Sequence, residues 1–187
     1  MDIYNDKNAP SISEVFFTDL GWVGVIGSSN TIRKITFPYE NRDSAEFSIR
    51  ISTKDVLHRS KSGDIVSNTC QQILRYLDGQ KVIFDQELAL VGTDFQVMAW
   101  NVVRNIPLGE TRSYSWIAEN IGKPKAFRAI GNAMRHNPVP ILIPCHRVIA
   151  KDGSMTGYGG KFGTGIKAKL LSIESNMIGM ESRNHLG

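Results

Sequence analysis

The chain has 187 residues and a formal net charge of +4, with room for one large domain or two small ones around a buried core. Hydrophobic residues make up 41% and charged residues 21% of the chain, as in an ordinary globular protein. The start is polar without a secretory pattern, and no run approaches the roughly 18 apolar residues of a membrane span, so we expect a soluble, intracellular protein.

The first part of the chain is predicted to form strands followed by a helix. Residues 13–38 contain β-rich runs separated by turn signals and read as an antiparallel meander. Residues 39–64 are polar and carry little signal. Residues 67–80 have the periodicity of an amphipathic helix, on which Cys70 is a small core residue. We therefore expect residues 1–90 to form a small α+β domain.

Helical signals dominate the rest of the chain. Residues 93–107 are predicted to form a helix, because Thr93 followed by Gln96 is a capping-box pattern. We expect a mostly helical domain over residues 91–175, followed by a tail over residues 176–187.

Two further helices are predicted close together, over residues 114–122 and 124–136. Pro124 suits the first position of the second helix. A glycine-containing turn between two such helices is typical of a helix-turn-helix motif, although many helical proteins contain such a pair by chance.

The second of these helices carries a basic stripe. Arg128, Asn132 and Arg135 recur at the spacing of one helix face. Small residues beside this stripe would let the backbone approach another surface closely: Ala126, Ala129, Gly131 and Ala133. The opposite face is expected to pack inward through Phe127, Ile130 and Met134. A solvated helix face would give the same basic stripe.

Charge is divided unevenly along the chain. Residues 1–88 hold 10 basic and 12 acidic side chains, whereas residues 89–187 hold 12 basic and 6 acidic ones. This asymmetry favours a second half that meets a polyanion such as a nucleic acid, with a solvated basic surface as the alternative.

Cys145 lies in the segment with the most unusual chemistry. The chain has two cysteines, which we expect to be free thiols, and its histidines lack zinc-site spacing with them. Prolines exclude a regular helix over residues 137–144, which we expect to be extended and buried. A short helical turn could begin at Cys145, where the helix dipole and His146 would favour a thiolate. A buried thiol beside a core histidine is the alternative.

The order of motifs around Cys145 resembles that of the O6-alkylguanine-DNA alkyltransferases, the methylated-DNA–protein-cysteine methyltransferases. "FQVMAW", "IPLGETRSYSWIA", "IGKPKAFRAIGNA", "NP", "PCHRVI", "GYGG" and "KLLSIE" follow one another between Phe95 and Glu174. The resemblance implies a ribonuclease-H-like N-terminal domain and a mostly helical, winged-helix-like C-terminal domain with a helix-turn-helix. The fold class is therefore α+β.

The resemblance also implies roles for individual residues. Cys145 would accept the alkyl group, His146 would act as its base through a water molecule, and Glu174 would fix His146. Asn137 would brace the loop that carries the cysteine. Tyr114 would help to protonate the departing guanine and would crowd a backbone phosphate.

DNA would be bound by the helix at residues 124–136, placed in the minor groove. Arg128 would fill the space left by the flipped base. The other residues implied for DNA contact are Tyr114, Ala126, Ala129, Gly131, Asn132 and Arg135. The residues implied for the alkylguanine pocket are Met134, Pro140, Val148, Tyr158, Gly159 and Lys167.

The implied activity is repair of DNA by irreversible transfer of an alkyl group from O6-alkylguanine, and also from O4-alkylthymine, to Cys145. Each molecule would act once, as a monomer, on double-stranded DNA with little sequence preference and with no cofactor, metal or membrane. A prokaryotic protein would be cytoplasmic, and a eukaryotic one nuclear.

Two other functions fit parts of the sequence. One is a non-catalytic protein that only binds alkylated DNA. The other is a papain-like cysteine hydrolase, which would need a distant catalytic histidine; the candidates His58, His136 and His185 lie in no recognisable motif.

Overall fold

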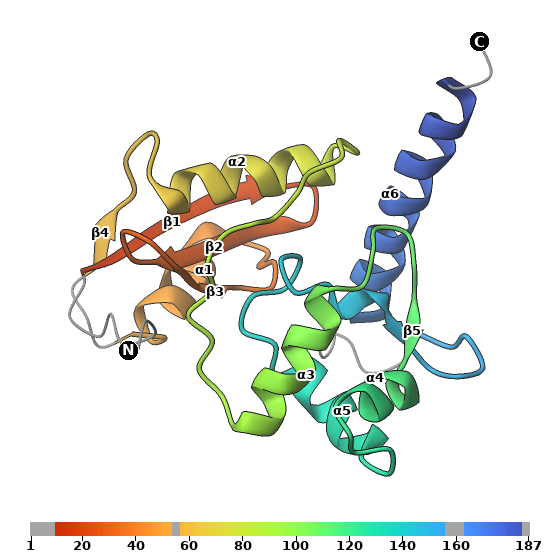
Figure 1. Ribbon diagram of the computed structural model, residues 1–187. Coiled ribbons are helices and arrows are strands. Elements are labelled where there is room, and N and C mark those ends of the chain that lie inside the picture. The colour runs from red at the N-terminus through yellow and green to blue at the C-terminus, as the bar shows by residue number, and fades with distance from the viewer. Residues whose placement is uncertain (1–9, 54–56, 156–162, 185–187) are drawn as a thin grey trace. The chain divides into compact units, whose positions relative to one another are not determined.

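The computed structural model describes residues 10–53, 57–155 and 163–184 (Figure 1). Their contacts fall into two compact units. The first comprises the described residues up to Leu77 together with Val82–Val91, and the second comprises Asp78–Lys81 and the described residues from Gly92 onward.

The first unit is built on a four-stranded mixed sheet with the order β3-β2-β1-β4. Strands β1 to β3 form the antiparallel meander predicted from residues 13–38, and β4 pairs in parallel with β1. With its helices, this sheet gives the ribonuclease-H-like arrangement expected for this half. The elements are β1 (Ser11–Thr18), β2 (Gly21–Gly27), β3 (Ile32–Ile35), α1 (Arg42–Arg50), β4 (Leu57–Arg59) and α2 (Ile65–Leu77).

Helix α1 lies where the sequence carries little signal. Asn41 caps it by accepting a 2.9 Å hydrogen bond from the backbone N–H of Ser44. Only Ala45, Ser48 and Ile49 of this helix are buried. Because so narrow a stripe leaves most positions polar, the hydrophobic periodicity is too weak to predict the helix.

Helix α2 (Ile65–Leu77) confirms the helix predicted over residues 67–80, although it begins two residues earlier and ends three residues earlier. Asp64 accepts a 2.7 Å hydrogen bond from the N–H of Ser67 and so satisfies the first turn. Cys70 is 2% exposed, as expected for a core residue, and burial raises the pKa of its thiol. This thiol is therefore kept protonated and inert.

The second unit contains the predicted helix-turn-helix. Helix α3 (Asp94–Arg104) begins with the predicted capping box at Thr93. Helices α4 (Tyr114–Asn120) and α5 (Phe127–Arg135) form the motif, and Gly122 ends α4 with a φ of 70°. The indole Nε1 of Trp100, on α3, donates a 2.9 Å hydrogen bond to the carbonyl of Ala133 and fixes α5 against α3.

Two details of the predicted motif are wrong. Helix α5 begins at Phe127 rather than at Pro124, because residues 123–126 form a turn in which the Ala126 N–H donates to the Lys123 carbonyl. Phe127 does not pack inward: it is 46% exposed at the start of the helix, and the Arg128 guanidinium lies 5.8 Å from the centre of its ring.

The second unit also contains a two-stranded parallel sheet, formed by β5 and β6. β5 (Arg112–Ser113) directly precedes α4, and β6 (Val148–Ile149) directly follows the short 3₁₀ helix η1 (Cys145–Arg147). Helix α6 (Gly163–Asn184) does not stop at residue 175, where the sequence suggested the start of a tail. No helix in the described part of the chain is both long and apolar enough to cross a membrane.

Candidate active site

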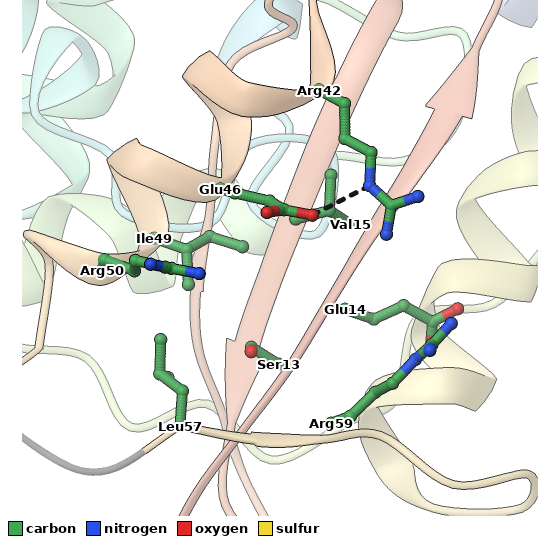
Figure 2. Close-up of a pocket in the computed structure, with 9 residues that line it drawn as sticks. All are labelled: Ser13, Glu14, Val15, Arg42, Glu46, Ile49, Arg50, Leu57 and Arg59. Atoms are coloured by element: carbon green, nitrogen blue, oxygen red, sulfur yellow. Dashed lines mark hydrogen bonds and ion pairs between the residues drawn. The ribbon is translucent and has the colours of Figure 1, made fainter.

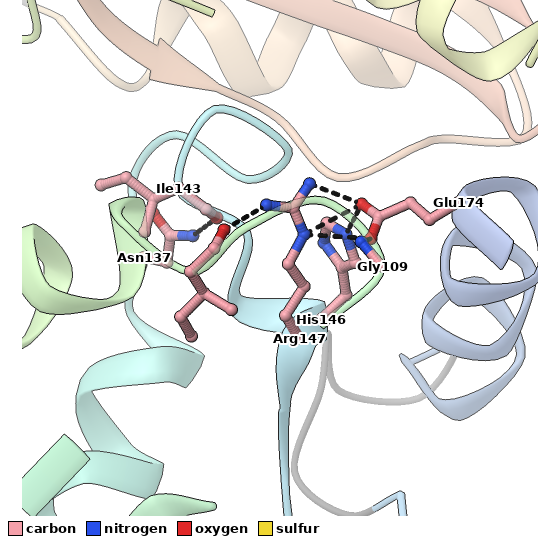
Figure 3. A network of polar contacts seen from close by, with 7 residues as sticks. Gly109, Asn137, Ile143, His146, Arg147 and Glu174 are labelled. Atoms are coloured by element: carbon pink, nitrogen blue, oxygen red, sulfur yellow. Dashed lines mark hydrogen bonds and ion pairs between the residues drawn. The ribbon is translucent and has the colours of Figure 1, made fainter. Parts of the chain in front are cut away.

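Cys145 begins the short helical turn η1, as predicted, and its side chain is buried. The amide Nδ2 of Asn137 donates to the Cys145 sulfur over 2.9 Å and to the carbonyl of Ile143 over 2.9 Å. The amide oxygen of Asn137 accepts a 3.0 Å hydrogen bond from the N–H of Val139. Asn137 therefore holds both ends of the loop in front of the cysteine (Figure 3 shows its bond to Ile143).

The loop over residues 137–144 is buried but, contrary to the prediction, not extended throughout. The Ile143 N–H donates a 3.0 Å hydrogen bond back to the Val139 carbonyl and closes a turn. Within it, Ile141 has a φ of 77°, which is costly for a β-branched residue. Strain of this kind persists only where surrounding contacts enforce it, and here the bonds of Asn137 and the buried aliphatic side chains do so.

His146 is fully buried beside the carboxylate of Glu174 on α6. Its Nε2 lies 2.8 Å from Glu174 Oε1. Because a carboxylate accepts hydrogen bonds, Nε2 carries the proton of the neutral ring and Nδ1 is the acceptor nitrogen. This is the orientation that a histidine base needs, because the nitrogen that faces away from the carboxylate is the one that can accept a proton.

The same carboxylate binds two further donors, both of which the sequence reasoning missed. Arg147 donates to Glu174 from Nε and Nη2, and the Gly109 N–H donates to Oε2 over 3.1 Å (Figure 3). Arg147 stands next to His146 in "PCHRV", so its place in the motif was the available signal. For Gly109, the sequence carried no signal of contact with Glu174 except the position of this glycine in the "LGE" turn.

Burial lowers the pKa of His146, and the hydrogen bond and charge of Glu174 act in the opposite direction. The positive charges of Arg147 and Lys167 lower the pKa of His146 further. A neutral imidazole able to accept a proton is thereby favoured near neutral pH.

Lys167, on α6, is a fully buried lysine close to this cluster. Its Nζ donates a 2.5 Å hydrogen bond to the Val148 carbonyl and lies 6.0 Å from the centre of the Tyr114 ring. Burial lowers the pKa of Lys167 to about 8, opposed by its interaction with Cys145. A basic group therefore lies near the Tyr114 ring and interacts with Cys145.

Tyr114 is the first residue of α4 and is partly exposed. A Cβ added at Gly131 would lie 3.9 Å from Tyr114 Cε1, so the ring lies beside the middle of α5. The β5–β6 ladder joins the residue before Tyr114 to Ile149, four positions after Cys145. Tyr114 is thus tied to the segment that carries Cys145.

Helix α5 presents the predicted basic face. Arg128, Asn132 and Arg135 are exposed, together with Ala129, while Ala126 and Gly131 are half-buried. Ile130 and Met134 are buried on the opposite side, as predicted.

The predicted pocket residues are only partly described. Met134, Pro140 and Val148 are buried in the second unit, whereas Tyr158 and Gly159 lie outside the described residues. The alkylguanine pocket therefore stays a prediction. Within residues 10–53, 57–155 and 163–184, no group of three or more histidine, cysteine, aspartate or glutamate side chains could hold a metal ion.

A pocket of about 280 Å³ lies in the first unit, between α1 and the β1–β4 edge of the sheet (Figure 2). Arg42 on its rim forms a 2.8 Å ion pair with Glu46. None of the residues predicted to take part in transfer lines this pocket.

The second unit thus combines a helix-turn-helix, a fold typical of DNA-binding proteins, with a buried cysteine next to a histidine–glutamate pair. Residues 94–176 match the sequence profile of the family described as 6-O-methylguanine DNA methyltransferase, DNA binding domain. A methylated-DNA–protein-cysteine methyltransferase of Methanosarcina barkeri is 50% identical over 108 residues, which cover 58% of this chain and 67% of the relative. A constitutive enzyme of that name from Bacillus subtilis is 48% identical over 104 residues, or 56% of this chain and 62% of its own length. These matches thus span about two thirds of the relatives' lengths.

Solved structures extend the likeness to the first unit. The Mycobacterium tuberculosis protein OGT in complex with DNA aligns with a TM-score of 0.74 and 34% identity, covering 89% of this chain and 94% of that one. The O6-methylguanine-DNA methyltransferase of Pyrococcus kodakaraensis aligns with a TM-score of 0.63 and 25% identity, covering 88% and 98%. The chain belongs to the methylated-DNA–protein-cysteine methyltransferase family.

Proposed function

We propose that this protein repairs DNA by transferring the alkyl group of O6-alkylguanine, and of O4-alkylthymine, irreversibly to Cys145. The observation that carries the proposal is the arrangement of a buried thiol, fixed by Asn137, next to a buried His146–Glu174 pair. The names of the relatives support the same reaction.

The transfer step follows from these groups. The thiol proton passes to Nδ1 of His146, directly or through water, because Nε2 is engaged by Glu174. The sulfur then attacks the alkyl carbon, the bond from that carbon to O6 breaks, and guanine leaves after taking up one proton. Tyr114, with its phenol beside a buried lysine, is the proposed donor of that proton. The thioether is stable, so each molecule reacts once.

DNA contact is proposed for the exposed face of α5. Its small residues suit the narrow minor groove, and Arg128 would fill the gap left by the flipped base. Because phosphate contacts carry no sequence information, recognition would depend little on the neighbouring bases. We propose that the protein acts as a monomer, with no cofactor, in the compartment that holds the DNA.

Incubation with a duplex that contains O6-methylguanine, followed by intact mass analysis, tests the reaction. We expect the protein to gain one methyl group in place of a proton, located on Cys145 by peptide mapping. Cys70→Ala serves as the matched control, since that thiol is buried in the core of the first unit and should not affect transfer. Binding to alkylated duplex without any gain of mass would favour a lesion-binding protein instead.

A further inference from the structure

The Arg147 side chain is hydrogen-bonded in two directions within the candidate site. Its Nε lies 3.1 Å and 3.0 Å from the two oxygens of Glu174, and its Nη2 lies 2.8 Å from Oε1. On the other side, Nη1 donates a 2.5 Å hydrogen bond to the Ile106 carbonyl. The guanidinium is therefore fixed between α6 and the segment that follows α3.

Glu174 shares its charge between two basic groups. Oε1 accepts from both His146 Nε2 and Arg147 Nη2, each over 2.8 Å. A lone buried carboxylate beside a histidine would strongly stabilise the imidazolium form. Here the adjacent guanidinium balances that carboxylate, so its pull on an imidazole proton is reduced.

Two other groups act on this pair. The backbone N–H of Gly109 binds the carboxylate, and the charge of Lys167, on α6, lowers the pKa of His146. Lys167 therefore also adds positive charge, and its ammonium donates a hydrogen bond to the Val148 carbonyl. Arg147 binds Glu174 directly, with Nη2 2.8 Å from Oε1.

We propose that Arg147 is a positioning residue, which binds Glu174 so that the carboxylate orients His146 without drawing a proton onto the imidazole. This inference rests on the proposed function, because a neutral His146 is what accepts the proton of Cys145. The bond to Ile106 keeps the guanidinium from leaving Glu174. A lysine at this position could supply the charge but not the fork of donors.

Arg147→Gln and Arg147→Lys test the proposal, with Arg42→Lys as the matched control. Arg42 also pairs with a glutamate, but it lies in the first unit and is half-exposed. For each full-length variant, the protonation of His146 is followed by NMR of labelled histidine across the acid range. The rate of methyl transfer to an O6-methylguanine duplex is measured over the same range of pH.

We expect the midpoint of His146 to rise by about one pH unit in Arg147→Gln, as is typical when a close charge is removed. The acid limb of the transfer rate should move with it, so that transfer at the most acidic points falls about tenfold more than at neutral pH. Arg147→Lys should show a smaller rise, and Arg42→Lys none.

A uniform loss of rate with an unmoved His146 midpoint would mean that Arg147 is merely structural, and would overturn the proposal. Failure of both Arg147 variants to fold would overturn it as well. If the unmodified protein transfers no methyl group, the proposed function fails, yet the NMR titration still decides whether Arg147 controls the protonation of His146.

Discussion

Asn137 donates a hydrogen bond of 2.9 Å from its side-chain amide to the sulfur of Cys145. The same buried amide also bonds the Ile143 carbonyl and the Val139 N–H. One side chain therefore supports the shape of the loop and the position of the Cys145 sulfur, and the two effects should be lost together.

Asn137→Ala is expected to destabilise the protein by about 1–3 kcal/mol, because it leaves the buried N–H of Val139 without its partner and removes one of the two donors to the Ile143 carbonyl, which keeps the N–H of Cys145. Methyl transfer should also slow at temperatures where the variant remains folded. Urea denaturation and single-turnover transfer measure the two effects. Asn120→Ala is the control, since Asn120 is exposed and bonds only the carbonyl one turn before it. Equal stability of the two variants would contradict the bracing role.

Arg128→Ala is expected to slow repair of a duplex about tenfold or more while leaving the reaction with free O6-benzylguanine nearly unchanged. The arginine is exposed on α5, so its removal should raise the cost of base flipping and leave the chemistry intact. Rates on the two substrates give the comparison, and Arg42→Lys again serves as the control. Equal losses on both substrates would remove the flipping role from Arg128.

The stability of the protein should rise between about pH 8 and pH 10 because of Lys167. Its pKa is about 8 in the folded chain against 10.5 for an ordinary lysine, so the unfolded chain binds more protons in this interval. The penalty for the buried charge is present below pH 8 and is relieved as the pH rises. In Lys167→Met this contribution, on the order of 2 kcal/mol, should be absent. The urea midpoints of the unmodified protein and of Lys167→Met, measured across the pH range, test this prediction. The same change of stability with pH in both proteins would contradict it.

Gly109→Ala is expected to cost about 1–2 kcal/mol of stability, because Gly109 has a φ of 74°. An added Cβ would also lie 1.9 Å from Cδ1 of Ile178 and would disturb the bond to Glu174. Gly122→Ala separates the two causes: its φ is 70°, but nothing lies within 4 Å of an added Cβ. The surplus cost at Gly109 should shrink when Ile178→Ala is added. If both substitutions lower the free energy of unfolding by the same amount, backbone strain alone explains the loss, and the contact with Ile178 contributes nothing.

Elements with strong local signals could be predicted from the sequence. The meander of β1–β3, the capping box at Thr93 and the helical turn at Cys145 each follow from neighbouring residues, and all are present. Helix α1 and β4 were missed, because one is mostly polar and the other has three residues.

The candidate site was predicted only in part, because its remaining contacts are long-range. Arg147 reaches partners 27 and 41 positions away in the chain, and no local pattern encodes such pairs. The positive φ of Ile141 was equally hidden, since aliphatic residues between prolines suggest an extended segment. Phe127 was misplaced because the turn over residues 123–126 delays the start of α5.

The two-residue pairing of β5 with β6 limits where residues can be inserted into this chain. Arg112 pairs with Val148 and Ser113 with Ile149, directly before Tyr114 and directly after the Cys145–Arg147 turn. A single inserted residue on either side would rotate the phenol or the sulfur to another direction. We therefore expect insertions to be tolerated beyond residue 149, in the turn at residues 151–153, but not within the few residues that connect the ladder to Cys145.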